Sequence, residues 1–233
     1  WLPFGGSGYL VLLALLVLML VMAVPLVLAP LSFRSRRAPG ERRGSTLAYF
    51  ACLGAGFMLL EVPLIQRTSL LLDHPAPALA AVLFFLLLAS GLGSLLANRM
   101  PLGLTLAGTS VLLVALAIVM RAMIPVAVVW PLPARLAALG LTLFPPGLLM
   151  GIPCAAGLRR VGVSLVPWAW AVNGAVSGLT GVIAALLTLD LGFTITLGLA
   201  ALAYLGAAFA GRSLPSAQAS AIEGAASPPA SQP

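Results

Sequence analysis

Glu61 is the residue whose type and position most suggest chemistry, because this carboxylate lies inside the apolar run FMLLEVPLI. An unpaired carboxylate in a lipid interior costs about 3 kcal/mol, so it must face other helices, find a partner or bind a proton. One interpretation is a carboxylate that couples to protons or cations, or that lines a polar substrate site. The alternative is a structural carboxyl near the outer end of its helix, paired to Arg67 or hydrogen-bonded to a neighbouring helix.

Three other polar residues are candidates for the same intramembrane or membrane-edge site. Gln66 and Arg67 follow Glu61 where its apolar run ends, and Asn173 lies inside a later apolar run. A buried amide needs a hydrogen-bond partner from another helix. Asn173 is expected nearer the inner end of its helix and Glu61 nearer the outer end, which disfavours a direct pair between them.

Three prolines, Pro145, Pro146 and Pro153, fall within another apolar run and predict a helix break there. Discontinuous membrane helices expose backbone groups that can bind ions or substrates. The alternative is a proline kink whose freed backbone groups are satisfied by neighbouring helices.

Other chemistry finds little support in the sequence. Asp73 and His74 are adjacent, but two ligands are too few for a metal site. The chain has no nucleophile elbow, no phosphate-binding P-loop and no HExxH motif. We therefore predict no catalytic residue, no metal site and no cofactor within this segment.

The composition is that of a membrane protein. Hydrophobic residues make up 61% of the 233 residues and charged residues only 7%, whereas soluble domains carry about 25% charge. This excludes a soluble enzyme, a disordered regulator and a nucleic-acid binder. The two cysteines, Cys52 and Cys154, lie in or beside apolar segments, so no disulfide framework is expected.

The apolar runs predict an all-α, polytopic transmembrane bundle of about seven helices. The predicted spans cover about 8–30, 46–65, 77–97, 102–120, 136–152, 166–188 and 191–210. Strands are excluded because the runs lack the period-two alternation of membrane barrels. Residues 211–233 are rich in Ser, Ala and Pro and are expected to be a disordered tail.

The arginines predict the orientation. All 12 basic residues are Arg, and threading the spans alternately gathers nine of them on one side. These nine are Arg34, Arg36, Arg37, Arg42, Arg43, Arg99, Arg159, Arg160 and Arg212. The positive-inside rule then places that side and the C-terminus in the cytoplasm, and Trp1 outside. The Arg34–Arg43 connection is also expected to contact anionic lipids of a bacterial inner membrane.

Small residues predict where helices pack. Gly54 and Gly56, the pair Gly147 and Gly151, and the pair Gly174 and Gly178 are interpreted as packing positions, as is the SGLGS segment at 90–94. Such residues let two helix backbones approach closely, so no ligand is needed to explain them.

Two motifs resemble a known family. The stretches at 54–99 and 166–193 are similar to the C-terminal membrane region of bacterial spermidine-synthase-like integral membrane proteins. The strongest motifs are GFMLLEVPLIQR in the first stretch, with Gly56, Glu61, Gln66 and Arg67, and PWAWAVNG in the second, with Asn173. The stretch LLMGIPCAAGLRR at 148–160 adds to the resemblance, which covers roughly residues 8–210 in order.

The resemblance implies a larger protein. In that family, membrane helices are joined to a Rossmann-like domain related to aminopropyltransferases and S-adenosylmethionine-dependent methyltransferases. Together with a start at Trp1 rather than Met, it predicts that this chain is a fragment and that an upstream catalytic domain is its partner and holds an S-adenosylmethionine-type cofactor. Anchoring that domain, admitting an apolar or polyamine-like substrate, and transport all stay open as the role of the membrane region.

The side of Trp1 leaves the topology open. A cytoplasmic catalytic domain directly upstream would need Trp1 inside, whereas the arginine bias places it outside. A further span, a span count wrong by one, or a domain that is not cytoplasmic would each reconcile the two. Two other functional hypotheses are a secondary transporter half that uses Glu61 and a scaffold subunit without a small-molecule site.

Overall fold

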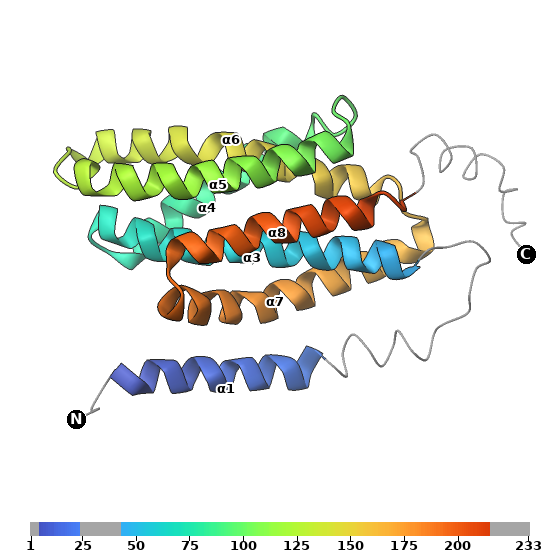
Figure 1. The fold of residues 1–233 in the computed structure, drawn as a ribbon, viewed down its shortest axis with the longest axis horizontal. Coiled ribbons are helices and arrows are strands. Elements are labelled where there is room, and N and C mark those ends of the chain that lie inside the picture. The colour runs from blue at the N-terminus through green and yellow to red at the C-terminus, as the bar shows by residue number, and fades with distance from the viewer. Residues whose placement is uncertain (1–4, 24–42, 215–233) are drawn as a thin grey trace, which may run out of the picture.

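The computed structural model describes residues 5–23 and 43–214, and within these ranges the chain is a bundle of α-helices without strands (Figure 1). The helices are α1 (Gly5–Ala23), α3 (Arg43–Leu72), α4 (Pro75–Ser94), α5 (Leu102–Ala127), α6 (Leu132–Leu158), α7 (Val166–Asp190) and α8 (Phe193–Gly211), with a short 3₁₀ turn at Val163–Leu165. Six of them are long and apolar enough to cross a membrane. The predicted all-α membrane bundle is therefore confirmed, and the protein is a multi-pass membrane protein.

Parts of the first predicted span and of the predicted tail lie outside the described residues. Of the span expected at 8–30, the structure describes the part within α1, which contains the apolar stretch Gly8–Met22. Arg34, Arg36, Arg37 and Arg42 lie outside the described residues, as do residues 215–233 of the tail predicted at 211–233. The start of that predicted tail belongs to the bundle instead, because Gly211 ends α8 and Leu214 is only 8% exposed.

Five helices form a closed ring, in the spatial order α3, α4, α6, α5, α8 and back to α3. Each helix of this ring packs directly against the next one, so α8 separates α3 from α5 and α6 separates α4 from α5. Outside the ring, α7 packs along α3, and α1 packs against α7 (Figure 1). As a result α3 has neighbours on several sides and is half-buried along its most apolar stretch.

Helix α3 is longer than predicted. The polar residues Gln66 and Arg67 were expected to follow the helix, yet they lie inside it, because the helix ends only at Leu72. The chain turns at Asp73, whose φ of 62° is left-handed, and Pro75 then starts α4 with its fixed φ. Polarity alone does not end a helix near a membrane surface, because long side chains can reach the interface from inside it.

The predicted helix break in α6 is wrong. The helix is continuous from Leu132 to Leu158 and contains Pro145, Pro146 and Pro153 in its interior. Prolines are tolerated in membrane helices when neighbouring helices hold the segment in place, and here α4 and α5 both pack against α6. The three prolines therefore do not create a discontinuous binding site.

Helices α4 and α6 approach each other through glycines. A methyl group on Gly93 would collide with the backbone of Leu148, and one on Gly151 would collide with the backbone of Ser90. Gly147 similarly faces Ala89. The packing interpretation of Gly147 and Gly151 is thus confirmed, since nothing larger than hydrogen fits between the two backbones.

The second glycine pair behaves differently. Within the described part of the chain, Gly174 has open space where a Cβ would lie, and Gly178 has only the Met19 sulfur, 3.9 Å from that position. Neither glycine mediates a close backbone approach there, so the packing interpretation of this pair is wrong for the described neighbours.

The described arginines separate by end. Arg43, Arg99, Arg159, Arg160 and Arg212 lie where α3, α5 and α7 begin and where α4, α6 and α8 end, on the right in Figure 1. Arg67, Arg121 and Arg135 lie toward the opposite end. We call these the arginine-rich end and the arginine-poor end of the bundle.

We expect Gly93→Ala to destabilise the protein and Gly91→Ala to leave it as stable or more so. Gly93 abuts the α6 backbone, so an added methyl group should cost about 1–3 kcal/mol. Gly91, on the same helix, has open space, and alanine is the better helix former there. Thermal unfolding in detergent measures both variants; equal midpoints would contradict the close contact.

Candidate functional site

Glu61 lies in the second half of α3 and is only 8% exposed. Its Oε2 atom is buried and has no hydrogen-bond partner among the described residues. Neither the predicted ion pair with Arg67 nor a hydrogen bond to a neighbouring helix is present in this part of the chain. Neither form of the structural alternative is therefore found among the described residues.

In the second half of α3, Nε of Arg67 and Oγ1 of the fully buried Thr68 are also buried and lack hydrogen-bond partners within the described ranges. Thr68 follows Glu61 by seven residues, about two helical turns, so both lie on one face of α3. The Arg67 guanidinium instead lies over the Phe193 ring at the start of α8, with 5.8 Å between its central carbon and the ring centre.

The face of α3 that carries Glu61 is the face that packs against α7. Gly54, seven residues before Glu61, abuts Asn173 and Ser177 of α7, and Gly181 lies against Met58 one turn further along both helices. The two helices therefore run in the same direction. Thr180, 8% exposed, adds a buried hydroxyl to this part of α7.

Asn173 belongs to a different depth. Its Nδ2 donates a hydrogen bond of 3.0 Å to the Phe50 carbonyl oxygen. Phe50 precedes Glu61 by about 16 Å along the helix axis. The prediction that Asn173 and Glu61 do not pair directly is confirmed, and Asn173 instead joins α7 to the first half of α3.

Gln66 does not complete a site. It is half-buried on α3 and forms no hydrogen bond within the described residues. Of the four predicted site residues, the structure places Glu61, Gln66 and Arg67 along a single helix and Asn173 on its neighbour, without bringing their polar atoms together.

Tyr49 is a structural residue that sequence reasoning missed. Its ring is fully buried, and its hydroxyl donates a hydrogen bond of 2.7 Å to the carbonyl oxygen of Pro153 in α6. Gly157 and Gly211 make room for this ring on α6 and α8. In the sequence, a tyrosine near a predicted helix start indicates an anchor at the membrane interface. Its role in joining α3 to α6 is visible only from its neighbours in the structure.

The arginine-poor end is held by Arg135. Its Nη1 donates to Asp73 Oδ2 at 2.9 Å and to the Leu71 carbonyl at 2.8 Å, and its Nε donates to the Trp130 carbonyl at 2.8 Å. The turn between α3 and α4 is thereby joined to the connection between α5 and α6. Asp73 thus serves as a partner for arginine.

Comparison of the chain with protein-family models, with curated proteins and with solved structures returned no match.

We expect Glu61→Gln to raise the thermal stability and Asn173→Ala to lower it. The glutamine replaces a buried carboxyl whose Oε2 has no hydrogen-bond partner among the described residues. The alanine removes the hydrogen bond to Phe50, which should cost about 1 kcal/mol. Thermal unfolding of the purified protein in detergent measures both. A clear loss of stability in Glu61→Gln would show that the carboxyl has a stabilising partner.

Proposed function

We propose that this chain is the membrane module of a spermidine-synthase-like protein and that it anchors or serves a Rossmann-type catalytic domain outside these 233 residues. The observation that carries the proposal is the contact between two of the stretches that resemble the family, 54–99 and 166–193. Gly54 of the first stretch packs on Asn173 of the second, and Met58 of the first lies against Gly181 of the second. The two stretches thus pack against each other where α3 meets α7.

The chemistry in this proposal belongs to the catalytic domain. That domain would bind an S-adenosylmethionine-type cofactor and transfer an aminopropyl or methyl group, with a polyamine-like or apolar acceptor. The helices described here would hold the domain at the membrane. Their partner would be the lipid bilayer, with anionic lipids bound at Arg34–Arg43.

We further propose a bacterial inner membrane, with the arginine-rich end and the C-terminus in the cytoplasm. This orientation is supported by the five described arginines at one end, against three toward the other.

Cysteine labelling tests the orientation. In a Cys52→Ala, Cys154→Ala background, Val129→Cys should react with an impermeant maleimide added to whole spheroplasts, because Val129 is 82% exposed at the arginine-poor end. Asn98→Cys, exposed at the arginine-rich end, should react only after permeabilisation. Labelling of both from the same side would contradict the fold, and the reverse pattern would contradict the orientation.

Cofactor binding tests the proposed module. The complete natural protein, purified from membranes, should bind S-adenosylmethionine or its decarboxylated form in calorimetry. The 233-residue chain purified alone should bind neither. Binding by the chain alone would overturn the proposal, as would a complete reading frame that encodes no Rossmann-type segment.

A second candidate function is a secondary transporter half, favoured by the buried Oε2 of Glu61, which has no hydrogen-bond partner among the described residues. In proteoliposomes with a pH gradient, Glu61→Gln should then abolish gradient-driven uptake of radiolabelled putrescine, because an amide cannot take up and release a proton as a carboxylate does. Asp190→Asn, which removes an exposed carboxylate at the end of α7, is the matched control and should retain uptake. Equal uptake by the wild type and Glu61→Gln would exclude this function.

A further inference from the structure

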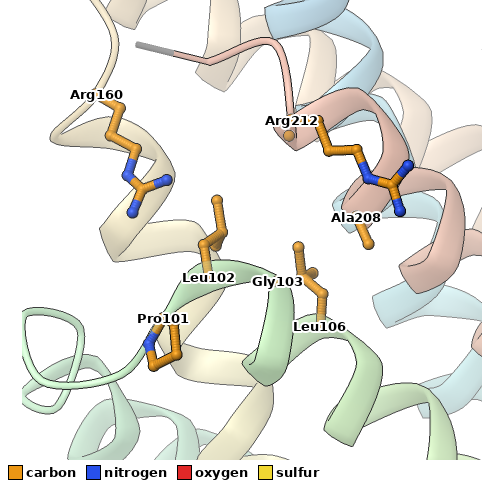
Figure 2. A pocket seen from close by; sticks show the side chains of 8 residues that line it. Pro101, Leu102, Gly103, Leu106, Arg160, Ala208 and Arg212 are labelled. Atoms are coloured by element: carbon orange, nitrogen blue, oxygen red, sulfur yellow. The ribbon is translucent and has the colours of Figure 1, made fainter. Parts of the chain in front are cut away.

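A cavity of about 280 Å³ opens at the arginine-rich end, where α5 begins and where α6 and α8 end (Figure 2). Its polar lining consists of the side chains of Arg160, just after α6, and Arg212, just after α8. Its apolar lining includes Leu102, Leu106 and Ala208. In Figure 2 the two arginines stand on opposite sides of the cavity, with the first turn of α5 between them.

Among the described residues, the charged side chains that line this cavity are both basic. None of the described residues that line it is acidic. The acidic residues within the described ranges lie elsewhere: Glu61 in the second half of α3, Asp73 at the turn after it, and Asp190 at the end of α7. Two guanidinium groups in a partly enclosed, partly apolar cavity attract an anion more strongly than the same groups would in open water.

The start of α5 adds to this attraction. Pro101 precedes the helix and provides no side-chain cap, and the first backbone bond runs from the Thr105 amide to the Pro101 carbonyl at 3.1 Å. The amides of the first turn consequently lack acceptors within the helix, and their dipoles favour a negative group beside them. Gly103 leaves this turn open, because no atom lies within 4 Å of where its Cβ would be.

We propose that this cavity binds the phosphate group of an anionic phospholipid, with Arg160 and Arg212 as its charged partners. The surface beside it favours a lipid over a free anion. Leu104 on α5 and Phe209 on α8 are 62% and 74% exposed, so an apolar surface that suits acyl chains continues from the cavity along both helices. The Arg212 guanidinium lies over the Phe209 ring, with 5.7 Å between its central carbon and the ring centre, where the cavity meets this apolar surface.

The test compares lipid retention by native mass spectrometry of the purified 233-residue chain. Wild-type protein should retain phosphatidylglycerol at least about tenfold better than phosphatidylcholine with the same acyl chains, as expected for charge-assisted hydrogen bonds. The double variant Arg160→Gln, Arg212→Gln should lose this preference. The matched double variant Arg99→Gln, Arg159→Gln removes two exposed arginines from the same end but outside the cavity, and should keep it.

A third variant separates the cavity from the charge. Gly103→Leu fills the open side of the α5 turn while both arginines stay in place, so it should weaken phosphatidylglycerol binding without any change of charge. If the Arg160→Gln, Arg212→Gln variant does not fold, Gly103→Leu still tests whether the lipid binds in this cavity. Wild-type retention by Gly103→Leu, or equal losses in both double variants, would overturn the site. Displacement of the lipid by millimolar inorganic phosphate would overturn its assignment to a lipid.

Discussion

The burial of α3 among several helices is the constraint on which the rest of the structure depends. In a bilayer, lipid is as apolar as leucine, so helices associate through close packing and polar contacts. Gly54 and Gly56 allow α7 and α8 to approach α3 from two sides, with Tyr204 of α8 against Gly56. This approach encloses Tyr49 and Glu61, which would otherwise face lipid.

The sequence predicts the helices well and their contacts poorly, for physical reasons. Length and apolarity decide whether a segment spans a bilayer, and both are local properties. The errors arose where local polarity or proline competed with packing, at Gln66 and Arg67 and at the prolines of α6. Glu61 could be recognised as unusual from its neighbours in the sequence. That its Oε2 has no hydrogen-bond partner in the described part of the chain depends on helices over 100 residues away, which local sequence does not show. The same holds for the cavity between Arg160 and Arg212, which only the ring of helices brings together.

Arginine plays opposite roles at the two ends. At the arginine-poor end, the guanidinium of Arg135 is directed at carbonyl and carboxylate oxygens and fixes two connections to each other. At the arginine-rich end, Arg160 and Arg212 line an open cavity, while Arg159 donates to the Asn98 side chain. Internal hydrogen bonds of Arg135 join the connections at one end, whereas arginine side chains line an open cavity at the other. Contacts with lipid headgroups or with an attached domain are therefore expected at the second end.

The order of the ring also bears on biogenesis. Helix α8 is synthesised after the other four helices of the ring, and it closes the ring between α3 and α5. Until it inserts, Gly56 on α3 and Ser110 on α5 lack their contacts with it. In the complete ring, Ser110 donates its hydroxyl to the Ala201 carbonyl at 3.1 Å. A nascent chain arrested before residue 193 would hold an open arc of helices. Membrane proteases that survey unassembled segments would find their substrate in that arc, so the lifetime of such intermediates depends on how quickly translation delivers α8.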